Sequence, residues 1–112
     1  MPGRDATVDA ASAVFDALAH PVRRDILRLL GEGEHTATGL AEPFSMSRPA
    51  VSQHLRILRE AGLVQEQRAG RNHIYALNPS ALLLIDEWLE HFRHFWPRRL
   101  RALDELLRRR TP

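Results

Sequence analysis

Side chains able to hydrogen bond with nucleic acid are concentrated between residues 47 and 56. A helix predicted over residues 48–61, capped by Ser47, places Ser52, Gln53 and Arg56 on one face, opposite an apolar stripe. Glutamine suits adenine, arginine suits guanine or phosphate, and serine suits several partners. The alternative is a solvated polar face, but this face is not rich in glutamate or in opposite-charge pairs. The predicted DNA contacts on this segment are Ser47, Arg48, Pro49, Ser52, Gln53, His54 and Arg56, with a packing role as the alternative for His54.

A second group of polar residues lies at the tip of a predicted β-hairpin. Segments 63–68 and 73–77 have strand character, and Gly70 and Asn72 between them can take the positive φ that a tight turn requires. A basic tip can reach a phosphate or an adjacent minor groove, although basic tips also serve solubility. Its place directly after the polar helix favours a DNA contact. The residues predicted to make it are Arg68, Arg71, Asn72 and His73.

The elements that position these residues follow from apolar spacing and helix-stop signals. Helices are predicted over residues 8–18 and 21–30, with His20 helping to cap the second. A short third helix, capped by Thr36 or Thr38, is expected to stop early at Pro43, and His35 is expected in a loop. The order of two helices joined by a short turn and followed by a hairpin predicts a mainly α fold with a small β-hairpin (α+β). This is the arrangement of a winged helix-turn-helix. We expect one domain, residues 1–112.

The last predicted helix, about residues 79–109, has apolar residues three and four apart, as in a helix–helix seam. Pro97 predicts a kink or break near Trp96. The stripe offers more apolar surface than a small core needs, so we expect a homodimer formed by the first and last helices. An aromatic small-molecule pocket is the less favoured alternative. The predicted interface residues are Phe15, Leu82, Ile85, Trp88, Leu89, Phe92, Trp96, Leu100 and Leu103.

Three blocks of the sequence together resemble the ArsR family of bacterial repressors. They are LAHPVRRDIL at residues 18–27, SRPAVSQHLRILREAGLV at residues 47–64, and Gly70-Arg71 with Tyr75. The resemblance runs from about Phe15 to Pro79. It implies a winged-helix homodimer that binds an inverted-repeat operator and blocks transcription, with dimer contacts from the first and last helices.

The family often senses metals, and at its metal sites this sequence departs from the pattern. The thiolate sites need cysteines near the third helix, and the chain has none. The zinc-type site needs an Asp-x-His where Asn78 and Ser80 stand, although His91-x-x-His94 fits its other half. We therefore expect no metal and no cofactor, and neither a metal nor a small molecule as effector. A metal-responsive repressor using His91 and His94, completed by Glu87 and Glu90, remains the alternative.

Composition limits the remaining classes of protein. The 112 residues carry a formal net charge of +2, and all 16 basic residues are arginine, so a nucleic-acid partner depends on how the arginines cluster. No phosphate-binding glycine loop, nucleophile elbow or His-Glu-x-x-His motif is present, so we expect no enzyme. A winged helix that binds only proteins is the other rival, and the polar helix face argues against it. No apolar run suits a signal peptide or a membrane span, so we expect a cytoplasmic protein with no membrane partner.

Overall fold

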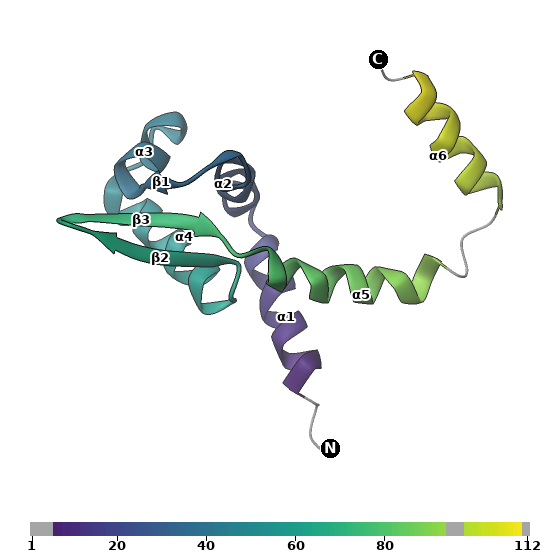
Figure 1. Cartoon of the computed structure of the whole chain (residues 1–112), viewed down its shortest axis with the longest axis horizontal. Helices are drawn as coiled ribbons and strands as arrows, with labels where there is room; N and C mark the ends of the chain where they lie inside the picture. The colour runs from purple at the N-terminus through teal and green to yellow at the C-terminus, as the bar shows by residue number, and fades with distance from the viewer. Residues whose placement is uncertain (1–5, 94–97, 111–112) are drawn as a thin grey trace.

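The computed structural model of the chain describes residues 6–93 and 98–110 (Figure 1). Within these ranges the structure is mainly helical, with one small antiparallel sheet. The helices are α1 (Ala6–Leu18), α2 (Pro21–Glu32), α3 (Ala37–Ala41), α4 (Arg48–Glu60), α5 (Leu82–Arg93) and α6 (Arg98–Arg110), with 3-10 turns η1 (Glu42–Phe44) and η2 (Pro79–Ala81). The strands are β1 (His35–Thr36), β2 (Val64–Ala69) and β3 (Asn72–Leu77).

Local side-chain caps set the starts of three helices, as the sequence predicts. The Val22 amide donates to His20 Nδ1 at 3.1 Å at the start of α2, and Thr36 Oγ1 accepts from Gly39 N at 3.1 Å at the start of α3. Ser47 caps α4 by accepting from the Ala50 amide. Each cap satisfies an amide that the first turn of a helix leaves without a backbone partner. The structure confirms the caps predicted at His20, Thr36 and Ser47.

The sheet has the strand order β1-β3-β2, and β2 and β3 form the predicted hairpin. Gly70 takes φ +63° in its turn, whereas Asn72 does not take the positive φ that the sequence allowed. Figure 1 shows the tip of this hairpin pointing away from α5. The short β1 was not predicted. His35, expected in a loop, instead pairs with Tyr75 of β3.

The hydrophobic core lies between α1–α4 and the sheet. On α4, Val51, Leu55 and Leu58 are fully buried, which confirms the apolar face predicted for this helix. Ile26 from α2 and Leu40 from α3 are also fully buried. Burying a side chain of this size stabilises the fold by about 1.5–3 kcal/mol. The core therefore fixes the rotation of α4 and decides which of its residues face solvent.

The C-terminal part, predicted as a last helix over about residues 79–109 with a kink or break near Trp96, begins with the 3-10 turn η2. Asn78 caps η2, because its side-chain oxygen accepts from the Ser80 amide, and its Nδ2 donates to Gly62 O at 2.9 Å. Helix α5 ends at Arg93 and α6 begins at Arg98, and the predicted break near Trp96 lies outside the described residues. Figure 1 shows α6 set apart from the other helices. Within the described ranges, every helix is too short or too polar to cross a membrane.

Candidate nucleic-acid interface

The outer face of α4 is polar and exposed. The side chains of Ser52, Gln53 and Arg56 are exposed, opposite the buried Val51 and Leu55. The exposed face also contains the residues of the first turn, Arg48, Pro49 and Ala50. Most of the predicted contact residues of this segment are thus brought together toward the N-terminal half of the helix. An α-helix that enters the major groove uses its N-terminal residues for base contacts.

A tight turn joins α3 to α4 and sets the angle between them. Ser45 takes φ 51°, the left-handed conformation, which few residues other than glycine adopt. The Met46 amide donates to Ala41 O at 3.3 Å, which closes the turn after η1. Pro43 lies in η1 and ends α3 early, as predicted. The two helices and this turn form a helix-turn-helix with α4 as its second helix.

Arg56 is less available than its exposure alone suggests. Its Nε donates to Glu60 Oε1 at 3.0 Å, one helical turn further along α4. Both side chains are well exposed, so water and salt screen this pair and it contributes little stability. Arg56 can therefore exchange Glu60 for a phosphate or base with little loss of folding free energy.

His54 does not share the outward-facing position predicted for it as a DNA contact. Its ring packs against that of His20, with centroids 4.6 Å apart, and its Nδ1 is buried without a hydrogen-bond partner among the described residues. Burial lowers the pKa of His54, and the charges of His20 and Arg23 lower it further. The placement separates His54 from the contact group and agrees with the alternative prediction of a packing histidine.

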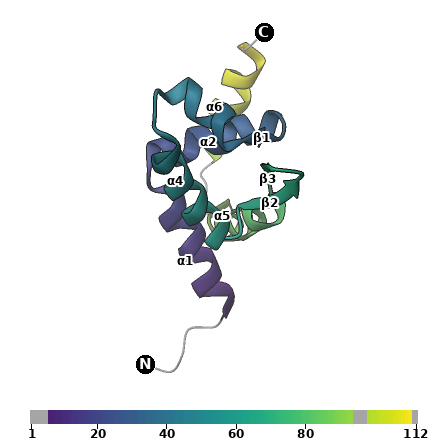
Figure 2. The same ribbon diagram turned by 90° about the vertical axis from the view of Figure 1, so that its left-hand side faces the viewer.

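The hairpin beside α4 exposes Arg68, Arg71, Asn72 and His73 near its tip, as predicted. Figure 2, which views the molecule from the side of the tip, shows α4 and the hairpin next to each other. Because β2 pairs with β3 up to Ala69 and Asn72, the turn is short and Arg71 lies at its end. The two groups of candidate contact residues therefore come from adjacent elements.

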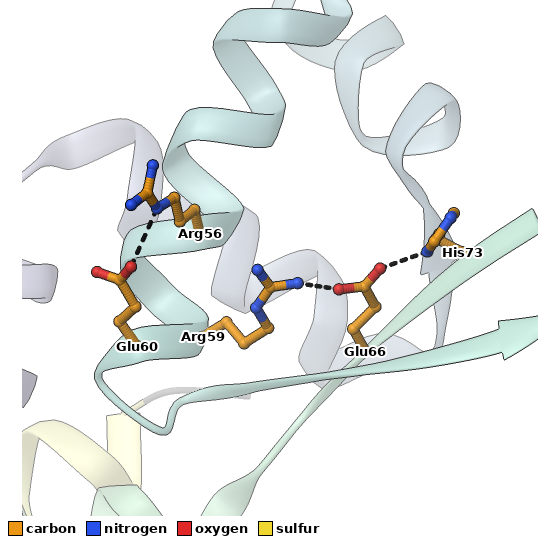
Figure 3. A network of polar contacts seen from close by, with 5 residues as sticks. All are labelled: Arg56, Arg59, Glu60, Glu66 and His73. Carbon is orange, nitrogen blue, oxygen red and sulfur yellow. Dashed lines mark hydrogen bonds and ion pairs between the residues drawn. The ribbon is translucent and has the colours of Figure 1, made fainter.

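A three-residue network, which the sequence did not indicate, joins the hairpin to α4 (Figure 3). Glu66 on β2 is paired with Arg59 of α4 and with His73 of β3. Glu66 is opposite Tyr75 in the register, so His73 is its diagonal neighbour on the same face of the sheet. The network holds His73 back against β2 and fixes the hairpin relative to the last turn of α4.

Within residues 6–93, positive charge is concentrated on this surface. Residues 6–93 contain nine arginines and eleven carboxylates, whereas residues 48–77 contain five arginines and two carboxylates. The α4–hairpin segment is thus net positive within a net negative domain. Such an arrangement favours binding of an anionic polymer at this surface of residues 6–93.

Comparison with known proteins agrees with this geometry. The profile of a helix-turn-helix domain family matches residues 18–67. The transcriptional repressor SdpR of Bacillus subtilis is 40% identical over 79 residues, which cover 70% of this chain and 88% of SdpR. An ArsR-like transcriptional regulator from Rhodococcus sp. RHA1 superposes with a TM-score of 0.72 at 32% identity, covering 91% of this chain and 96% of that one. The chain belongs to the ArsR family of winged helix-turn-helix transcriptional regulators.

The structure of an ArsR-family relative adds information on assembly. The homodimeric winged helix-turn-helix DNA-binding domain Mb0332 of Mycobacterium bovis (fragment 1–100) superposes with a TM-score of 0.65 at 28% identity. The superposition covers 85% of this chain and 94% of Mb0332. Together the comparisons confirm the predicted fold and the family that the three sequence blocks resemble.

The metal sites of the ArsR family were an open point of the sequence analysis. Among residues 6–93 and 98–110, no group of three or more histidine, cysteine or acidic side chains lies close enough to hold a metal ion. His91 is exposed on the last turn of α5, and His94, its predicted partner, lies outside the described residues. Asn78 and Ser80 are occupied in capping η2, where Ser80 Oγ donates to Asn78 Oδ1 at 2.7 Å. The absence of a metal effector therefore stays a prediction.

Proposed function

We propose that this chain is a sequence-specific transcriptional repressor that binds an inverted-repeat operator as a homodimer. The observation that carries the proposal is the exposed polar N-terminal half of α4 beside a basic hairpin, in a segment with five arginines and two carboxylates. Repression then requires only occupancy of the operator, without a catalytic step, and takes place in the cytoplasm.

In the proposed complex, α4 lies in the major groove and the hairpin reaches the neighbouring backbone. Ser52 and Gln53 lie where a groove-bound helix meets base edges, and Arg48 lies at the end that faces phosphates. Arg71, at the turn of the hairpin, would contact a phosphate or the minor groove. Arg56 would leave Glu60 to join the contact. His73 contributes less because Glu66 already holds it.

The proposed dimer forms through α1 and α5. Phe15 of α1 and Trp88 of α5 meet edge to face, with ring centroids 5.3 Å apart, and Trp88 also packs against Phe92. All three aromatic side chains remain at least one-third exposed, and the exposed Leu82 adds apolar surface on α5. Contiguous apolar surface of this kind marks an association site. A two-fold dimer presents two α4 helices symmetrically, which requires an operator with inverted half-sites.

A metal-responsive repressor is the second candidate. It rests on His91, which is exposed one helical turn after Glu87 on α5. Two copies of a helix could bring two such pairs together, but one histidine and one carboxylate from each make a weak site. We therefore favour DNA binding that does not depend on a transition metal.

Selection of DNA by the purified chain tests the proposed function. Random duplexes that survive several rounds of binding should share two inverted half-sites about one helical turn apart. A chain with Gln53→Ala and Arg56→Ala is the matched control, because both positions are exposed and the core is unchanged. Enrichment of no common sequence, or equal enrichment by the control, would contradict the proposal.

A further inference from the structure

Helix α6 is amphipathic, and its apolar side is not covered within the described chain. Leu100, Leu103 and Leu106 follow one another at intervals of three residues, so they lie on one side of the helix. Each of these leucines is more than half exposed. A stripe of exposed leucines on a helix is stable in water when a second apolar surface covers it.

The charge of α6 is opposite to that of the helices proposed to form the dimer. Helix α6 contains six arginines, one aspartate and one glutamate, which gives +4. Helix α1 contains two aspartates and no basic residue, and α5 contains three carboxylates and one arginine, so each of them carries −2. The α1–α5 layer and α6 are therefore equal and opposite in formal charge.

The outward face of α5 combines the apolar and acidic character that α6 requires in a partner. Leu83 is more than half exposed. Asp86, Glu87 and Glu90 follow it at i+3, i+4 and i+7, so they surround it on the same face. Arg93 pairs with Asp86 and Glu90, at 2.9 and 2.8 Å, and offsets only part of this charge. Two such faces brought together would place like charges opposite one another.

The α6 of the same chain does not cover this face. The Arg101 guanidinium donates to Arg93 O at 2.7 Å, which ties the first turn of α6 to the last turn of α5. From that corner the two helices diverge (Figure 1). The leucines of α6 and Leu83 of α5 all stay exposed in this arrangement.

We propose that in the homodimer α6 of each copy docks on the outward face of α5 of its partner. The leucine stripe of α6 covers Leu83, and its arginines lie among Asp86, Glu87 and Glu90. Trp88 and Phe92 follow Leu83 by five and nine residues, which places them on the other side of the same helix, so the docked α6 and the proposed α1–α5 contact can occupy different faces of α5. This inference rests on the proposed homodimer and extends it, because the two subunits exchange their α6 helices.

Disulfide trapping tests the docking directly, because the wild-type chain contains no cysteine. Chains with Leu83→Cys and Leu103→Cys, carrying tags of different size, are co-expressed at full length and oxidised mildly. We expect a covalent heterodimer. The matched control pairs Leu83→Cys with Glu105→Cys, which is exposed on the opposite side of α6. Docking would hold the two cysteines of the first pair at a high effective concentration. The first pair should therefore cross-link at least about tenfold faster than the control pair.

Each other outcome identifies a different arrangement. An intrachain disulfide in the Leu83→Cys/Leu103→Cys double variant would show that α6 folds onto its own α5, and would overturn the inference. Equal cross-linking of both pairs, or none, in a chain that sediments as a dimer would overturn it while leaving the homodimer intact. A monomeric wild-type chain would overturn both proposals. Binding to phosphatidylserine vesicles that Leu103→Glu abolishes, without a cross-link, would assign the stripe to a membrane.

A charge reversal gives a second readout that does not depend on cysteine. Glu87→Arg removes attraction to α6, so the dimer dissociation constant should rise about two- to fivefold, the usual range for one exposed ion pair. Glu34→Arg makes the same charge change beside β1, far from α5, and should leave dimerisation unchanged. Added salt should reduce the difference between wild type and Glu87→Arg. Equal effects of the two substitutions would contradict docking at this face.

Discussion

The imidazole of His54, in the middle of α4, packs against that of His20, the residue that caps α2. One ring thus belongs to the helix proposed to read DNA, and the other fixes the start of a core helix. His20 Nδ1 accepts the Val22 amide and so holds the first turn of α2. The contact therefore joins the position of α4 to the start of α2.

The first prediction concerns the pH dependence of folding. The pKa of His54 is lowered from 6.5 by burial, then by His20 and Arg23, so the unfolded chain binds a proton more readily than the folded one. This contribution to stability is complete above the unfolded value of 6.5 and is lost as the pH falls below it. His54→Phe should make the free energy of unfolding less dependent on pH between 5.5 and 7.5 (about 1 unit on either side of that value), as measured by urea denaturation.

The exposed Gln53 provides the control for this experiment, because Gln53→Phe places the same aromatic ring on α4 outside the core. It should leave the pH dependence of unfolding as in the wild type. An identical pH dependence in wild type and His54→Phe would show that the buried ring does not link protonation to stability.

The second prediction concerns base readout by α4. Gln53→Ala should remove a base contact and cost about 1–3 kcal/mol of operator binding, with relaxed preference at one position in each half-site. Gln65→Ala, at an exposed position on β2 away from α4's outer face, is the matched control. Titration of selected operators at fixed salt measures both. Operator affinity that is the same for wild type and for Gln53→Ala with Arg56→Ala would contradict the assignment.

Most of the fold could be predicted because its determinants are local. The caps at Thr36 and Ser47 each need one side chain within three residues of the amide it satisfies. Likewise, Val51 and Leu58 mark the buried side of α4 by spacing alone. The pairing of β1 with β3 could not be predicted this way, because it joins two-residue and six-residue segments far apart in the chain.

Two parts of the candidate site depended on packing that the sequence does not display. His54 lies three residues after Val51 and four before Leu58, so spacing places it at the edge of the buried stripe. The orientation of its ring depends on the contact with His20 at the start of α2. Arg59 and Glu66 meet because the hairpin folds back along α4. The packing position of His54 was signalled by the spacing of the apolar residues, and the prediction of a DNA contact overlooked that signal. The Arg59–Glu66 pair could be found only from the folded structure.

The third prediction concerns the hairpin. Arg71→Ala should weaken binding to all DNA sequences about equally, because a phosphate contact carries no sequence information. It should also reduce the slope of log K against log salt concentration by about one unit, because one phosphate contact is lost. Arg28→Ala is the matched control, since Arg28 is exposed on α2 and pairs only weakly with Asp25 at 3.5 Å. Fluorescence anisotropy over a series of salt concentrations measures the slope. A loss confined to one operator sequence, with an unchanged slope, would indicate direct base reading.

The last prediction is that operator binding does not depend on a transition metal. The chain has no cysteine, so the thiolate sites that select soft metals cannot form. The side chain of Asn78 donates to Gly62 O and caps η2. It is therefore not available as a metal ligand beside His91. Zinc, nickel or cobalt at stoichiometric concentration should therefore leave the operator dissociation constant unchanged, in the wild type and in His91→Ala alike. Calorimetry of the metal-free chain supplies the independent measurement. Sub-micromolar binding of one of these ions, lost in His91→Ala and coupled to release of DNA, would instead mean that His91 and the carboxylates of α5 complete a sensor site between two copies.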